Sequence, residues 1–205
     1  GGAADYIETI LLPNLGIIGT DINVAADDNT DTDGDGYPDW VEAVAGSDPN
    51  NNGSTPADTD GDSVPDIVEI LEGSDPGDAG DYADTDADGH PDYVEVLEAT
   101  DPNSNTDVPA DTDGDGVPAS VEIAQGTDPS DGTSYLDTDG DNQPDYVEVV
   151  DAATGGTGDL NDIGSLVVDT DGDGVPDIVE VMQGTDINDA LDYLDTDEDG
   201  VPDYY

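Results

Sequence analysis

The tripeptide Asp-Thr-Asp recurs through this chain, and its spacing constrains the fold more than any other feature of the sequence. Its seven occurrences begin at Asp31, Asp58, Asp84, Asp111, Asp137, Asp169 and Asp195. The steps between them are 27, 26, 27, 26, 32 and 26 residues. A steady period of this length predicts a tandem repeat, in which neighbouring units share one buried face. The alternation of 27 and 26 indicates a larger unit of two copies, and the long step reflects an insertion at residues 151–168.

The charge of the chain is the second constraint. Its 205 residues include 55 acids and neither lysine nor arginine, so the formal net charge is −55. Self-repulsion of this size destabilises a compact state unless counter-ions are bound. Such a chain is either disordered or completed by cations, and the regular register of the seven copies favours cations. Nucleic acids and anionic membranes are not expected partners, because both require basic side chains.

Two further classes are disfavoured by the composition. The chain has no cysteine, which removes disulfides and thiolate metal sites. The apolar stretch at residues 7–22 is interrupted by Glu8, Pro13 and Asp21, so it is too short and too broken to span a bilayer. With one Trp, one Met and no Phe, we expect only a small hydrophobic core.

Each copy follows the pattern D-x-D-x-D-G-x-P-D-x-x-E, and we count positions from its first Asp. Side-chain oxygens at positions 1, 3 and 5, the carbonyl of position 7 and a bidentate Glu at position 12 can surround one hard cation. Position 9 adds an oxygen directly or through water. Six to eight oxygen ligands in this spacing favour calcium over magnesium, while zinc and copper prefer His or Cys. Positions 1, 3, 5, 9 and 12 hold 33 of the 55 acids, so most of the charge lies at predicted ligand positions.

The predicted ligands fall into seven sets, one for each copy. They are Asp31, Asp33, Asp35, Tyr37, Asp39 and Glu42; Asp58, Asp60, Asp62, Val64, Asp66 and Glu69; Asp84, Asp86, Asp88, His90, Asp92 and Glu95; Asp111, Asp113, Asp115, Val117 and Glu122; Asp137, Asp139, Asp141, Gln143, Asp145 and Glu148; Asp169, Asp171, Asp173, Val175, Asp177 and Glu180; and Asp195, Asp197, Asp199, Val201 and Asp203. We expect about seven calcium ions or more.

Two copies depart from the pattern in ways that should weaken them. Ala119 stands at position 9 of copy 4, and Ser63 replaces the glycine at position 6 of copy 2, where the turn needs positive φ. We expect these two loops to release their ions first. Asn142 occupies position 6 of copy 5, and Asn tolerates that backbone region.

The residues after each loop predict a short helix. Position 8 is proline in every copy, which is suited to the start of a helix and cannot make the backbone pairing of an EF-hand pair. Apolar residues at positions 10, 11, 13 and 14 give the stripe of a two-turn helix. Gly46, Gly73, Gly126 and Gly184 then predict its end. We therefore expect a calcium-stabilised tandem repeat array, mostly loops with short two-turn helices and little hydrophobic core.

These repeats resemble the bacterial form of the thrombospondin type 3 repeat. The resemblance is carried by "DTDGDGYPDWVEAVAGSDP", "DTDGDSVPDIVEILEGSDP" and "DTDGDGVPDIVEVMQGTDI". It implies an extracellular or cell-surface protein whose chain winds around calcium ions, often more than one per repeat. The chain departs from animal members of the family by lacking cysteine, and it has a proline at position 8 throughout.

The chain has two expected parts. Residues 1–30 form an apolar docking segment that is extended or β, and residues 31–205, which the resemblance covers, form the seven repeats. The last loop lacks its Glu, and "DYIE" at residues 5–8 matches positions 9–12 of the other copies. We expect Glu8 to complete the Asp195 loop of a neighbouring chain, giving head-to-tail self-association. The opposing expectation is that the sequence is a window of a longer chain.

Two function classes follow. The first is an extracellular structural subunit of a surface filament or rod stiffened by calcium, and the second is a calcium-dependent adhesion or spacer region of a larger surface protein. An enzyme is not expected, because the carboxylates are committed to metal. His90 at position 7 should be a surface side chain, and Asn52-Gly53-Ser54 is a candidate glycan acceptor.

Overall fold

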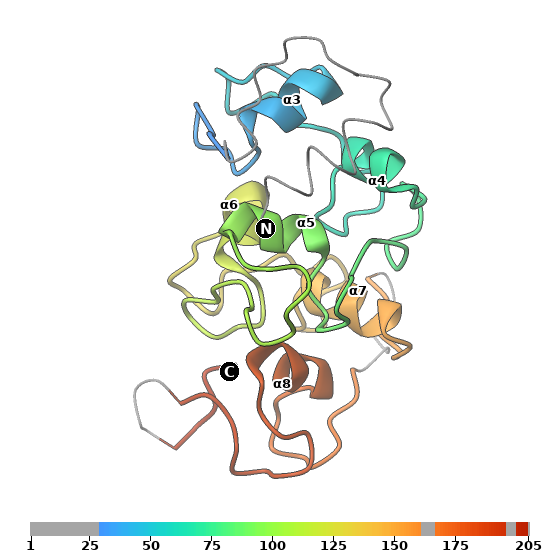
Figure 1. Cartoon of the computed structure of the whole chain (residues 1–205). Coiled ribbons are helices and arrows are strands. Elements are labelled where there is room, and N and C mark those ends of the chain that lie inside the picture. Colours follow the sequence, from blue (N-terminus) through green and yellow to red (C-terminus); the bar gives the residue numbers. More distant parts are fainter. Residues whose placement is uncertain (1–28, 161–166, 196–199, 205) are drawn as a thin grey trace.

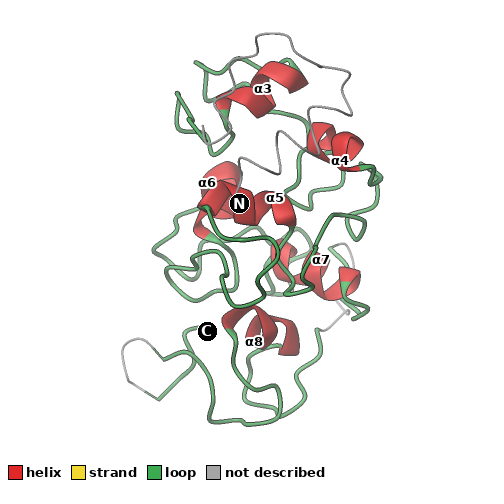
Figure 2. Ribbon diagram, in the orientation of Figure 1, coloured by secondary structure: helices red, strands yellow, loops and turns green. Residues whose placement is uncertain are grey.

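The computed structural model describes residues 29–160, 167–195 and 200–204, and in these ranges it contains short helices joined by loops, without strands. Figures 1 and 2 show the helices spread along the long axis of the molecule from α3 to α8, with α5 and α6 at about the same level. They are α3 (Asp39–Ala45), α4 (Asp66–Glu72), α5 (Asp92–Glu98), α6 (Ala119–Gln125), α7 (Asp145–Ala153) and α8 (Asp177–Gln183). This confirms the loop-rich repeat array. The expected extended segment at the N-terminus lies outside the described residues.

Every helix begins at position 9, one residue later than the sequence suggested. The proline at position 8 is the N-cap in an extended conformation, as at Pro38 with φ −63° and ψ 142°. Its carbonyl accepts the first helical hydrogen bond, from Glu42 N–H at 3.2 Å. Because the ring fixes φ, proline sets the direction in which the chain enters the helix.

Four of the helices end where glycine predicts, and α5 and α7 are the exceptions. Gly46 has φ 90° and takes the left-handed conformation that closes α3. Ala99 closes α5 in the same conformation with φ 61°, although its Cβ makes this costly. The helix α7 continues to Ala153 and so includes the first residues of the insertion.

The helices contact one another in pairs. The most extensive helix–helix contacts join α3 to α4, α5 to α6, and α7 to α8. Each pair comes from an odd-numbered copy and the even-numbered copy that follows it. This matches the two-copy unit that the alternating steps of 27 and 26 residues indicated.

One continuous core connects all the helices. It runs from Trp40 and Val41 in α3 to Met182 in α8, and most of its members are valine. In the even copies the residue at position 7 is a valine that is completely buried: Val64, Val117 and Val175 are at most 1% exposed. The core is narrow because each copy contributes only a short helix and one loop residue, as the composition led us to expect.

Copies that are distant in sequence also pack closely. A Cβ at Gly36 in loop 1 would lie 2.7 Å from the backbone N of Ala124 in α6, so loop 1 rests directly on copy 4. Copy 4 also packs on copy 6, since a Cβ at Gly116 would lie 3.2 Å from Val179 Cγ2. Copy 4 also contacts copy 2, where Gln125 Nε2 donates to Ser63 Oγ at 3.2 Å. The repeats therefore form a compact winding stack in which each copy contacts more than its sequence neighbours.

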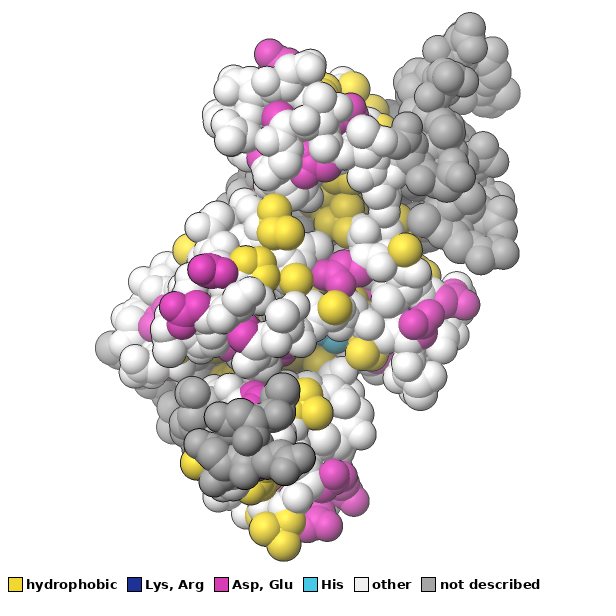
Figure 3. Space-filling view, turned by 90° about the vertical axis from the view of Figure 1, so that its left-hand side faces the viewer, with side chains coloured by type: hydrophobic (Ala, Val, Ile, Leu, Met, Phe, Trp, Pro, Cys, Tyr) yellow, Lys and Arg dark blue, Asp and Glu magenta, His cyan; other side chains and the backbone are white. Residues whose placement is uncertain are grey.

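Acidic side chains lie in separate groups on the surface. Figure 3 shows exposed Asp and Glu side chains in several places along the molecule, with apolar side chains between them. No helix in the described ranges has the length and apolar character needed to cross a membrane.

Candidate metal centres

The loops bring three aspartates of each copy together. In copies 1 to 5, one carboxylate oxygen from each of positions 1, 3 and 5 lies within 4.8 Å of the other two. The structure therefore places these predicted ligands side by side, as the D-x-D-x-D spacing requires.

Backbone N–H groups hold the first and fifth positions in place. In copy 4, Asp111 Oδ1 accepts from Gly114 N–H at 2.8 Å, and Asp111 Oδ2 accepts from Gly116 N–H at 2.9 Å. Asp115 Oδ1 accepts from Val117 N–H at 3.0 Å. The turn needs positive φ at position 4 as well as position 6, with 88° at both Gly114 and Gly116. The sequence pattern did not reveal this requirement at position 4, because that position is Ala87 in copy 3, where φ is 62°.

The glutamates at position 12 provide the clearest sign that the loops are cation sites. Their side chains are at most 1% exposed in all six described copies. Both carboxylate oxygens of Glu95, Glu122 and Glu180 are buried without a hydrogen-bond donor, and so are both oxygens of Asp113 at position 3. An ionised carboxylate buried without a partner is strongly destabilised, and this chain has no lysine or arginine to pair with it. A purely oxygen donor set of this kind fits a hard cation such as calcium.

Burial and mutual repulsion shift the titration of these groups. Burial, together with the charges of Asp60 and Asp58, raises the pKa of Glu69 to about 8. Burial likewise raises the pKa of Glu95 to about 9 and the pKa of Asp62 to about 9. Bringing these carboxylates together without a cation therefore requires protonation or costs folding free energy.

The aspartate at position 9 joins the loop to its helix. Asp39 Oδ1 accepts from Thr32 N–H at 2.8 Å, and Asp39 Oδ2 accepts from Thr32 Oγ1 at 2.6 Å. The same pair of bonds forms in copies 2, 3, 5 and 6, at 2.6 to 2.8 Å. We call this contact the Thr–Asp clasp. It gives the threonine at position 2 a structural role in these five copies, whereas the ligand role of position 9 stays a prediction.

The expectation that His90 is a surface residue is wrong. Its side chain is 4% exposed, and its Nδ1 lies 3.1 Å from Tyr146 Oη in α7. Burial lowers the pKa of His90 to about 4, which favours the neutral ring. The side chain does point away from the loop, but it points into the core, because copy 5 packs against copy 3 at this place.

Copy 5 differs from the other copies at two predicted ligands. The side chain of Gln143 donates from Nε2 to Asp141 Oδ2 at 3.1 Å, and Asp159 N–H from the insertion donates to Glu148 Oε1 at 3.2 Å. Asp151 holds the start of the insertion, since its Oδ2 accepts from Thr157 N–H at 2.7 Å. The loop motif gave no sign that the insertion would bond to a predicted ligand of copy 5.

The seventh loop closes without its glutamate. Asp203 N–H donates to Leu194 O at 2.9 Å, the same loop-closing bond as in the six other copies. Asp195 Oδ2 accepts from Gly200 N–H at 2.9 Å. The predicted ligands Asp197 and Asp199, and Glu8 of the docking segment, lie outside the described residues.

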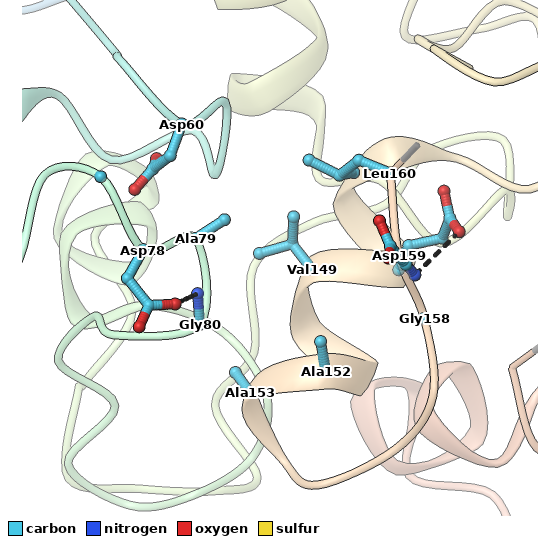
Figure 4. Close-up of a pocket in the computed structure, with 12 residues that line it drawn as sticks. Asp60, Asp78, Ala79, Gly80, Val149, Ala152, Ala153, Gly158, Asp159 and Leu160 are labelled. Atoms are coloured by element: carbon cyan, nitrogen blue, oxygen red, sulfur yellow. Dashed lines mark hydrogen bonds between the residues drawn. The ribbon is translucent and has the colours of Figure 1, made fainter. Parts of the chain in front are cut away.

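A separate hollow of about 540 Å³ lies between the turn at residues 77–80 and α7 (Figure 4). Asp60 and Asp78 line one side, while Val149 and Ala153 line the other. The carboxylate of Asp78 accepts from Gly80 N–H at 3.4 Å. Its lining combines one loop aspartate with residues of the turn, α7 and the insertion, so it is distinct in composition from the calcium loops.

Comparison with known families agrees with this geometry. The model of the bacterial TSP3 repeat matches residues 31–52, 111–132 and 169–190, which are copies 1, 4 and 6. Neither a curated protein nor a solved structure matches the chain. The chain thus contains bacterial TSP3 repeats, a structural calcium-binding repeat rather than an enzyme family. It is a calcium-binding repeat protein.

Proposed function

We propose that the chain is an extracellular structural element that calcium makes rigid, and that it serves as the subunit of a surface filament or rod. The observation that carries this proposal is the set of position-12 glutamates, which are completely buried in a chain without basic residues. The fold brings these carboxylates together where no lysine or arginine is present to compensate them, so that a bound cation is needed to keep them ionised. Calcium binding would therefore stabilise the folded array directly.

The proposed ligands of each ion are the oxygens of positions 1, 3, 5 and 12 with the carbonyl of position 7. The aspartate at position 3 has spare capacity to bind cations, since both oxygens of Asp33 and of Asp113 are buried without a hydrogen-bond donor. The turn after the helix lies close to this position: a Cβ at Gly132 would lie 3.5 Å from Asp113 O. This spare capacity supports more than one ion per copy.

Self-association is supported by the apolar surface at the C-terminal end of the array. Leu191, Leu194 and Val201 are 85%, 42% and 48% exposed, whereas the position-7 counterparts of Val201, which are Val64, Val117 and Val175, are at most 1% exposed. We propose that residues 1–30 of one chain cover this face of the next, and that Glu8 completes the Asp195 loop. A contact between two different faces repeats without closing, and so builds a filament.

Electron microscopy of the purified chain tests the filament directly. We expect filaments in calcium and none after chelation. Deletion of residues 1–12 should abolish them while the isolated subunit keeps its helix content in calcium. Filaments of normal length from the deleted chain would refute the docking role of this segment.

The second candidate is a calcium-dependent adhesion or spacer region of a larger surface protein. It is favoured by the spread of the helices along one axis, from α3 at one end to α8 at the other, which suits a spacer (Figure 1). A chain that stays monomeric in calcium at high concentration would support this reading. A glycan at Asn52, which lies exposed in the turn after α3, remains a proposal that intact-mass measurement of native material would test.

A further inference from the structure

Copy 4 is the one copy of the first six that cannot form the Thr–Asp clasp. Ala119 occupies position 9, so Thr112 has no carboxylate at the place where the other copies provide one. In copy 3, for comparison, Asp92 accepts from Thr85 N–H at 2.7 Å and from Thr85 Oγ1 at 2.6 Å. The junction between loop 4 and α6 therefore needs another connection.

Glu98, the last residue of α5, makes that connection from the preceding copy. Its Oε2 accepts from Ala110 N–H at 2.7 Å, and its Oε1 accepts from Ser120 N–H at 2.9 Å. Ala110 immediately precedes the first ligand of loop 4, and Ser120 is the second residue of α6. The carboxylate thus joins the entrance of the loop to the start of its helix, which are the two segments that the clasp joins elsewhere.

The ligands of loop 4 are otherwise arranged as in the intact copies. Asp111 and Asp115 make the same backbone bonds as their counterparts, and Glu122 is completely buried. The residue before the loop keeps its usual contact as well, because Ala119 N–H donates to Ala110 O at 2.9 Å. Loop 4 therefore has the geometry of a complete site despite its missing aspartate.

We propose that Glu98 is a positioning residue for calcium at loop 4, and that it replaces the absent position-9 carboxylate from the neighbouring copy. This inference rests on the proposed calcium ligands of the loops. Loop 4 should then not release its ion early, because Glu98 holds the junction between the loop and α6 in place of the missing aspartate. It also couples two sites, since the carboxylate that holds loop 4 belongs to the helix that follows loop 3.

Calcium titration followed by amide NMR of the full-length chain tests the proposal one loop at a time. The Gly116 amide reports loop 4 and the Gly36 amide reports loop 1, because each donates to the first aspartate of its own loop. Glu98→Gln should raise the calcium midpoint at Gly116 about tenfold, as expected for losing a charge-assisted contact. The midpoint at Gly36 should rise much less, because loop 1 touches copy 4 only through the packing of Gly36 on Ala124 and receives no bond from Glu98.

Glu72→Gln is the matched control. Glu72 has the same position at the end of α4, but the loop that follows it keeps the clasp between Thr85 and Asp92. The control should leave the midpoints at both Gly36 and Gly116 unchanged. An equal rise at both amides in Glu98→Gln would show a general loss of stability and would overturn the positioning role.

Ala119→Asp provides the rescue, because it restores the clasp partner of Thr112. In this background Glu98→Gln should lose most of its effect on Gly116. A full tenfold effect that persists in the double variant would contradict the replacement. These outcomes concern loop 4 alone, whereas the proposed calcium function would fail separately if neither amide responded to calcium.

Discussion

Replacing Gly36 with alanine should destabilise the array much more than the same change at Gly34. Both glycines have positive φ, 92° and 78°, so alanine costs about 1–2 kcal/mol at either position through the backbone alone. A Cβ at Gly34 would meet nothing within 4 Å, whereas a Cβ at Gly36 would lie 2.7 Å from Ala124 N. Overpacking of this kind costs about 1–3 kcal/mol more. Gly36→Ala should therefore lose about 2–5 kcal/mol of unfolding free energy and Gly34→Ala about 1–2 kcal/mol.

Urea unfolding at saturating calcium measures both values, with the fluorescence of Trp40 as one probe and far-ultraviolet circular dichroism as the other. The two glycines flank Asp35 in one loop, so any effect on the ligands is closely matched. The difference between the variants isolates the contact of loop 1 with α6. Equal losses of unfolding free energy would refute the packing of copy 1 on copy 4.

Two further predictions concern the backbone and the protons. Ala99→Gly should raise the free energy of unfolding by about 0.5–1 kcal/mol, because Ala99 is exposed and holds φ 61° at the end of α5; calorimetry that shows a loss would contradict this reason. In excess chelator, helix content should rise as the pH falls from about 9 towards about 4.5. The pKa of Glu95 in the ion-free fold is raised to about 9, so the folded state binds more protons than the unfolded state across that window and gains stability as pH falls. Helix that forms in chelator only at high pH, as seen by circular dichroism, would contradict this prediction.

The loops and helices were predictable because their determinants are local. The D-x-D-x-D spacing, the proline before each helix and the glycine after it all act within a single copy. The loops form as expected, each helix begins one residue after its proline, and α3, α4, α6 and α8 end at the predicted glycine. The glutamates at position 12 were recognised from the same spacing, and their burial agrees with a role at the ion. What failed was the placement of single side chains, as at His90, which lies in the core instead of on the surface.

The contacts between copies could not be predicted, because nothing in one repeat specifies which distant repeat it will touch. The bond from His90 to Tyr146 spans 56 residues, and the bond from Gln125 to Ser63 spans 62 residues. A signal was present in the alternation at position 7 of the first six copies, where even copies have valine and odd copies have Tyr37, His90 or Gln143. The replacement of the position-9 carboxylate by Glu98 needed the structure, since it depends on the geometry between two helices.

The central claim is that calcium completes the fold of this chain. Small-angle X-ray scattering during titration with a chelator tests it most directly, with circular dichroism on the same samples. The account predicts that removing calcium at pH 7.5 eliminates the helices and expands the chain towards a radius of gyration of about 50 Å, roughly three times that of a compact chain of this length. A radius of gyration and a helix content that do not change in excess chelator would contradict it.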